Sequence, residues 1–199
     1  MVASNNVGAR GSWRARLSRL VTLAPLRRGP EVRFVVSFVF IAAVLFSVYS
    51  FPYRADSWPQ RWSEGYLRAY AHLAGGVLWV FDRAVVVSGQ DISGRYGLRI
   101  IRGCDAVDAQ ILLLAALFAS HTYSWRWRVG GALAGLAVIT AANVARICCL
   151  YYVGILAPAY FDFFHHEFWP LLLIVFATAT FVLWSRIAAA PGGAVRAVG

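Results

Sequence analysis

The sequence predicts an all-α protein: a polytopic membrane helix bundle of about four spans plus an interfacial helix, with a short extracytoplasmic β-hairpin. Hydrophobic residues make up 60% of the 199-residue chain, whereas a soluble domain is usually about half apolar. Several runs approach the roughly 20 apolar residues that a helix needs to cross a bilayer. All 19 basic residues are arginines, and many of them flank these runs, as is typical of membrane proteins.

Residues 1–33 are predicted to be a basic cytosolic tail. Positive charge beside a membrane segment stays in the cytosol, so this tail orients the first span. No nucleic-acid partner is expected, because the arginines serve here as a topology signal. The arginines that precede the first apolar run are Arg10, Arg14, Arg16, Arg19, Arg27, Arg28 and Arg33.

A membrane-embedded domain is predicted over residues 34–188, and it begins with a span at 34–51, "FVVSFVFIAAVLFSVYSF". In residues 53–83, arginines, acids and aromatic residues interrupt the apolar face, which indicates an amphipathic helix in the interface. Its stretch "LAGGVLWVF" is too short to cross the bilayer. Residues 84–103 combine β-branched residues with glycines and predict the hairpin.

Three further spans are predicted, at about 104–120, 129–153 and 166–184, followed by a cytosolic tail at 189–199. The connector "HTYSWRWR" places aromatic rings beside arginines, as expected at a cytosolic interface. With the N-terminus inside, residues 53–103 and the link between the last two spans lie outside. A multi-pass protein of the cell membrane, inner or plasma, is therefore expected.

Three polar residues on different spans fall at one predicted depth, near the outer surface. Counted from the nearest cytosolic arginine, Cys104, Arg146 and His165 lie 22, 18 and 21 residues away along their helices. At about 1.5 Å per residue these spacings correspond to about 33, 27 and 31 Å, close to the roughly 30 Å of the hydrocarbon core. The three side chains are therefore expected to meet in an extracytoplasmic site.

These residue types together suggest acyl transfer. A thiolate at Cys104, favoured by a helix N-terminus and a nearby guanidinium, is a strong nucleophile toward a peptide carbonyl. His165 is suited to carry the proton to the leaving amine. Arg146 is suited to donate hydrogen bonds to the oxyanion of a tetrahedral intermediate. Such a reaction passes through a thioester.

Three neighbouring residues are predicted to support this site. Asn143 precedes Arg146 by three on one helix face and is expected to orient the guanidinium. Asp162 precedes His165 by three and is expected to orient the imidazole, and His166 lies beside it. Neither a metal nor another cofactor is expected, because adjacent histidines point about 100° apart on a helix and make a poor metal pair.

Three stretches resemble the exosortase/archaeosortase family, and most of all its exosortase H type. The resemblance covers about residues 84–187 and does not extend to the N-terminal tail. The order Cys, Asn-x-x-Arg, His is specific in a membrane protein, although each piece alone is weak. The stretches are "GCDAVDAQILLLAALFA" (103–119), "NVARICCLYYVG" (143–154) and "FDFFHHEFW" (161–169).

The resemblance implies that Cys104, Arg146 and His165 are catalytic, with His165 preferred to His166 because it keeps the F-D-F-x-H spacing. It also implies a sortase-like membrane cysteine protease or transpeptidase. Such enzymes process secreted proteins with a C-terminal sorting signal, made of a short motif, a hydrophobic helix and a basic cluster. With the basic end inside, the scissile bond would reach the outer interface. Secreted proteins and membrane lipid are therefore the expected partners.

Two other interpretations remain open from the residues alone. In the first, the protein is a non-catalytic membrane assembly or transport subunit that uses Arg146 and His165 for packing or ion pairing. In the second, it is a membrane metalloprotease, which metal analysis and chelator sensitivity would reveal. Replacement of Cys104 separates an enzyme from a structural subunit, because only the enzyme then loses its activity while the protein still folds.

Overall fold

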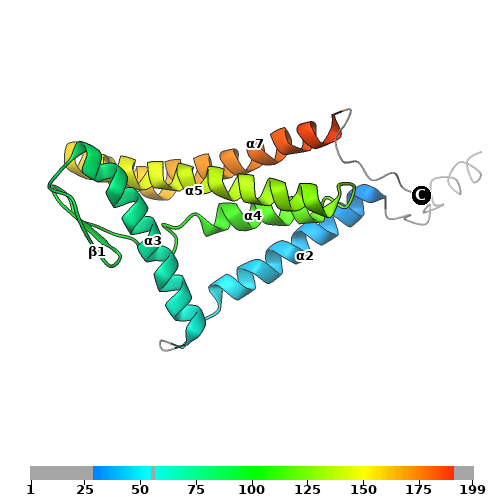
Figure 1. Cartoon of the computed structure of the whole chain (residues 1–199), viewed down its shortest axis with the longest axis horizontal. Helices are drawn as coiled ribbons and strands as arrows, with labels where there is room; N and C mark the ends of the chain where they lie inside the picture. The colour runs from blue at the N-terminus through cyan, green and yellow to red at the C-terminus, as the bar shows by residue number, and fades with distance from the viewer. Residues whose placement is uncertain (1–28, 55–56, 191–199) are drawn as a thin grey trace, which may run out of the picture. The chain divides into compact units, whose positions relative to one another are not determined.

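The computed structural model describes residues 29–54 and 57–190, and these are mostly helical (Figure 1). The predicted all-α class is confirmed, while most of both predicted tails lies outside the described residues. In chain order the elements are α2 (Pro30–Ser50), α3 (Trp58–Phe81), β1 (Val86–Ser88), β2 (Asp91–Ser93), β3 (Leu98–Arg99), α4 (Val107–Ala119), α5 (Trp125–Leu156), the 3-10 turn η1 (Pro158–Tyr160), α6 (Phe161–Phe163), the π-helical turn η2 (Phe164–Phe168) and α7 (Trp169–Ala189).

Three of the described helical segments are long and apolar enough to cross a membrane: α2, α5 and the run Pro158–Ala189 that ends with α7. The second predicted span is shorter than expected, because α4 has 13 residues and a length of about 20 Å. Its predicted start at Cys104 is wrong. Gly103 and Ala106 have φ values of 91° and 56°, and a helix cannot continue through left-handed backbone.

Helix α3 corresponds to the predicted interfacial helix, and it is not among the segments suited to cross a membrane. One of its faces is buried against the sheet and α5, through residues such as Leu67, Ala71 and Leu78. Its other face exposes large aromatic side chains, among them Trp62 and Trp79. Exposed tryptophans on an amphipathic helix are typical of the boundary between lipid and water.

The predicted hairpin is part of a three-stranded antiparallel sheet with the order β1-β2-β3. Two strands alone are marginally stable, and β3 completes the sheet by pairing Leu98 with Ile92. A tyrosine of α5 anchors this sheet. The Tyr151 hydroxyl donates to Asp82 Oδ2 (3.1 Å) and accepts from the backbone N–H of Arg95 (2.9 Å).

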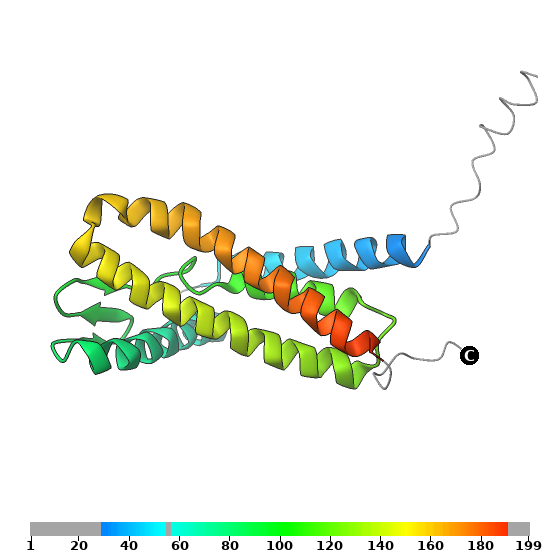
Figure 2. The same ribbon diagram turned by 90° about the horizontal axis from the view of Figure 1, so that it is seen from above.

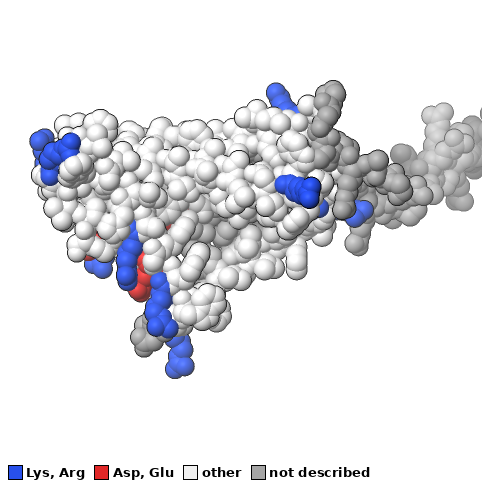
Figure 3. Space-filling model, in the orientation of Figure 1, with Lys and Arg blue, Asp and Glu red and all other residues white. Residues whose placement is uncertain are grey.

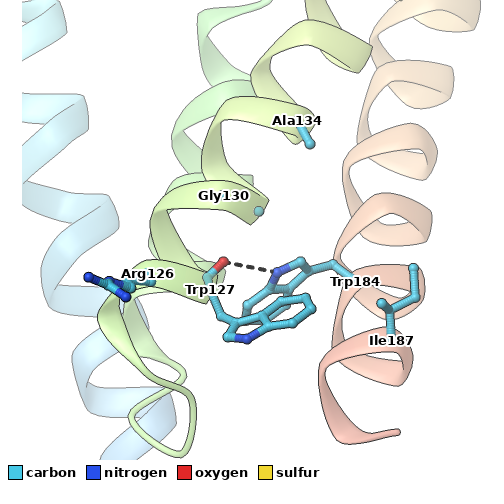
Figure 4. A pocket seen from close by; sticks show the side chains of 7 residues that line it. Arg126, Trp127, Gly130, Ala134, Trp184 and Ile187 are labelled. Carbon is cyan, nitrogen blue, oxygen red and sulfur yellow. Dashed lines mark hydrogen bonds between the residues drawn. The ribbon is translucent and has the colours of Figure 1, made fainter. Parts of the chain in front are cut away.

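Helices α4, α5 and α7 pack around a shared core that includes Leu113, Ile139 and Leu173. Figure 2 shows α5 and α7 side by side and antiparallel, with the strands beside the end where the two helices connect. At the opposite end of α5, the Trp184 indole N–H donates to the Trp127 carbonyl, next to a cavity of about 370 Å³ (Figure 4). The bundle thus holds the sheet and the α5–α7 connection together at one end.

One face of the described part of the molecule has a broad band without charged side chains (Figure 3). On the face shown in Figure 3, they gather near α3 and the sheet and near the opposite end of the bundle, with uncharged surface between. Helices α5 and α7 also expose large apolar residues, among them Leu133, Leu171 and Leu183. Lipid tails are the environment that such a surface requires, so the protein is a membrane protein.

Candidate active site

Cys104 lies in a tight turn between β3 and α4. Its backbone N–H donates to the Ile101 carbonyl at 2.9 Å, and its side chain is half-buried. Gly103 has a φ of 91°, a backbone conformation that residues with a Cβ rarely adopt. Because α4 begins at Val107, the thiol lies before the helix and not in its first turn, where the sequence placed it.

Arg146 is the buried charge of α5, with only 3% of its side chain exposed. One terminal nitrogen donates to the Gly103 carbonyl (3.3 Å) and the other donates to the His165 carbonyl (3.2 Å). The guanidinium therefore connects the turn of Cys104 to the turn of His165. These charge-assisted bonds explain how an apolar helix keeps an arginine.

His165 lies in the π-helical turn η2 and points toward the thiol. Its Nε2 is 3.3 Å from Cys104 Sγ, within hydrogen-bonding distance for sulfur. A π-helical turn interrupts the regular ladder of the helix and is frequent at functional sites. Here the His165 carbonyl accepts from Arg146, so the same turn supplies both the imidazole and an acceptor for the guanidinium.

His166 contacts the imidazole of His165, where the sequence analysis expected Asp162. The Nδ1 atom of His165 lies 3.2 Å from Nε2 of His166, and the two ring centroids are 4.3 Å apart. Asp162 makes no hydrogen bond to His165 within residues 29–54 and 57–190. The physical reason is the wider π-helical turn, which changes the spacing at which side chains share a face.

Asn143 is fully buried one helical turn before Arg146. Its side-chain N–H donates to the Cys104 carbonyl at 2.9 Å. No hydrogen bond joins Asn143 to the guanidinium among the described residues. The residue thus holds the backbone of Cys104 and does not orient Arg146 as predicted.

Sequence reasoning missed a group of buried polar residues beside the turn. Asp105 is 2% exposed, and the Tyr49 hydroxyl of α2 donates to its Oδ2 at 2.8 Å. The Tyr66 hydroxyl of α3 donates to Gln110 Oε1 at 2.9 Å, and burial raises the pKa of Tyr66 well above its usual value. In the sequence, the polar residue Gln110 within the apolar run 109–119 could have indicated this buried polar group. This network ties α2 and α3 to the start of α4.

The three predicted catalytic residues line one cavity of about 270 Å³, which is also lined by β3 and the residues on either side of it, 96–101. Phe161 forms part of the wall, with its ring centroid 5.8 Å from that of Tyr96. A thiol and an imidazole in contact, beside a fixed guanidinium, form a constellation suited to nucleophilic attack on a carbonyl.

The sequence model of one family, the transmembrane exosortases, matches residues 11–185 of this chain. The match begins far before residue 84, and so it includes most of the tail for which the sequence analysis found no resemblance. Comparisons with curated proteins and with solved structures gave no match. Because the family match covers most of the chain and includes the whole cavity, the protein belongs to the transmembrane exosortase family.

Proposed function

We propose that this exosortase is a membrane cysteine peptidase and transpeptidase, of the exosortase H type, that cleaves C-terminal sorting signals through a thioester at Cys104. The observation that carries the proposal is the contact of 3.3 Å between Cys104 Sγ and His165 Nε2. Residues 61 positions apart in the sequence are brought together in a cavity that is large enough to admit a peptide backbone. A purely structural role does not require this contact.

The reaction begins with transfer of the thiol proton from Cys104 to Nε2 of His165. The thiolate attacks the scissile carbonyl, and an S–C bond forms while the carbonyl electron pair moves to oxygen. Collapse of this intermediate breaks the C–N bond, and His165 returns the proton to the leaving amine. Water, or the amine or hydroxyl group of an acceptor, then attacks the thioester and gives its proton to His165. The C–S bond breaks, and the proton passes from His165 to the Cys104 thiolate, which restores the starting thiol and imidazole.

Arg146 is proposed to stabilise the oxyanion of the tetrahedral intermediate. Two of its N–H groups hold the carbonyls of Gly103 and His165, which fixes the guanidinium plane at the edge of the cavity. Arginine has five N–H donors, so donors remain for the substrate oxygen. A donor that is already oriented costs little reorganisation when the charge forms.

The proposed substrates are secreted proteins that end in a short motif, a hydrophobic helix and a basic cluster. With the N-terminus of the enzyme in the cytosol, the cavity opens outside the membrane and the basic cluster of the substrate stays inside. The substrate helix and the enzyme share the lipid bilayer, which raises their effective concentration. Few specific contacts are then needed at the cavity.

His166 is proposed to position the imidazole of His165 during proton transfer. We expect His166→Ala to lower kcat about tenfold with little change in KM, because Nδ1 of His165 then loses its partner at 3.2 Å. His166→Asn is expected to recover part of the loss, since an amide oxygen also accepts from Nδ1. Steady-state cleavage of a reporter substrate measures both parameters. Equal kcat values for wild type and His166→Ala would remove His166 from the mechanism.

The thioester itself provides the direct test of the proposed function. Membranes that contain the protein and a reporter fused to a host sorting signal are quenched in acid, digested and examined by mass spectrometry. We expect a peptide of the reporter bound to Cys104 and released by hydroxylamine. Cleavage without any adduct at Cys104, or an adduct at Cys149 instead, would contradict the proposal. Absence of cleavage by the purified protein would favour the non-catalytic subunit.

A further inference from the structure

β3 is an edge strand whose outer side is open among the described residues. It pairs only with β2 in the sheet order β1-β2-β3. In the antiparallel register Ile92 lies opposite Leu98, and the Ile100 N–H donates to the Gln90 carbonyl at 2.9 Å. Open strand edges attract further strands, and proteins usually cover or blunt them.

The backbone of Arg99 is directed toward this open side. In an antiparallel pair, successive residues turn their N–H and C=O groups alternately toward and away from the partner strand. Because Ile100 bonds β2, the N–H and C=O of Arg99 point away from β2. The Arg99 side chain is exposed, and its Nε lies 3.6 Å from Asp91 Oδ1 on the sheet.

The open side of β3 faces the cavity that contains the thiol. Alternate residues of a strand point to opposite faces, so a cavity over one face of a sheet touches every second residue. This cavity is lined by both residues of β3, Leu98 and Arg99, and by the flanking residues 96, 97, 100 and 101. Lining by two successive strand residues places the cavity along the edge of the strand. Cys104, Arg146 and His165 form the other side of the same cavity.

We propose that the sorting signal binds as an additional β-strand along the open edge of β3, with its backbone hydrogen-bonded to Arg99. The inference rests on the proposed function and specifies how the active site binds the substrate. The bound segment is the one that precedes the scissile bond, because the segment that follows it leads into the membrane helix. An extended peptide that pairs with β3 lies between the strand and Cys104 Sγ, which presents its carbonyls to the thiolate.

A proline substitution tests the backbone contact. Arg99→Pro removes the outward N–H and leaves the Ile100–Gln90 bond to β2 in place, as proline at an edge strand can. Arg99→Ala removes the same side chain and keeps the N–H, so the difference between these two variants isolates the backbone group. We expect cleavage of the reporter to be about tenfold slower in Arg99→Pro than in Arg99→Ala. Alkylation of Cys104 by iodoacetamide is measured in the same membranes.

Slow cleavage by Arg99→Pro with unchanged alkylation of Cys104 supports the docking mode. Equal cleavage by the two variants overturns it, and the thioester at Cys104 remains untouched by that result. If the proposed function itself is wrong, neither the wild type nor any variant cleaves the reporter or forms the adduct at Cys104, so that outcome is distinguished from failure of the docking mode.

If Arg99→Pro also lowers the alkylation of Cys104, slow cleavage by this variant no longer reports on the backbone contact alone. A cross-link then provides a second test of the docking mode. A photoreactive benzoylphenylalanine replaces Gly97, which is exposed and has open space around its Cα, in a Cys104→Ala background that retains the precursor. We expect a cross-link to reporter residues within a few positions before the cleavage site. Cross-links confined to the membrane helix of the reporter, or none at all, overturn the proposal.

Discussion

Replacement of Cys104 by alanine is expected to abolish cleavage of sorting signals, with a loss of at least about 10⁴-fold in kcat. No other sulfur can take its place, because Cys148 and Cys149 lie within α5 and outside the cavity lining. The substitution removes one half-buried sulfur atom and leaves the backbone bonds of the turn to Ile101 and Asn143 intact. Expression and thermal unfolding in detergent are therefore expected to stay close to wild type.

Cys149→Ala is the matched control for this prediction. It makes the same chemical change at another half-buried cysteine, and cleavage by this variant is expected within about twofold of wild type. The assay compares precursor and processed reporter in membranes over time. Processing by Cys104→Ala at a rate near that of Cys149→Ala would show that the thiol is not the nucleophile.

Replacement of Arg146 is expected to have the second largest effect, because one guanidinium serves both turns of the site. In Arg146→Ala the carbonyls of Gly103 and His165 lose their buried donors, and each such charge-assisted bond contributes about 1.5–3 kcal/mol. Arg146→Lys keeps the charge. However, a single ammonium cannot reproduce the planar fork that spans two carbonyls. We expect Arg146→Lys to lose about 100-fold or more in kcat and to remain folded, and Arg146→Ala to lose stability as well.

Thermal unfolding in detergent and single-turnover formation of the thioester separate these two effects. Arg186→Lys serves as the control, since Arg186 is exposed near the end of α7 and should tolerate the change. A cleavage rate of Arg146→Lys within about threefold of Arg186→Lys would refute a need for the bidentate geometry.

Several features of this protein followed from the sequence because they depend on chain length and hydrophobicity. The three helical segments that are long and apolar enough to cross a membrane coincide with apolar runs of the sequence. Counting residues along the expected helices predicted that Cys104, Arg146 and His165 would meet, and the structure brings the three together, although Cys104 lies before α4. The amphipathic pattern of residues 53–83 likewise predicted a helix unsuited to span the membrane.

Other features required the tertiary structure, because they depend on backbone geometry that packing imposes. The left-handed conformations of Gly103 and Ala106 shorten α4. The π-helical turn places His166, and not Asp162, against the imidazole of His165. Neither the left-handed residues nor the π-helical turn produces a hydrophobic periodicity that could be recognised in the sequence.

The sequence by itself thus indicated that Cys104, Arg146 and His165 lie near one end of the bundle, since helix rise and apolar length convert residue number into position along a helix. The tertiary structure alone decided their partners. Asn143 holds the Cys104 carbonyl, and Arg146 holds the carbonyls on either side of the thiol–imidazole contact. Those bonds join residues remote in sequence, and they form only because packing of the helices removes water and brings these buried donors against backbone carbonyls of the protein.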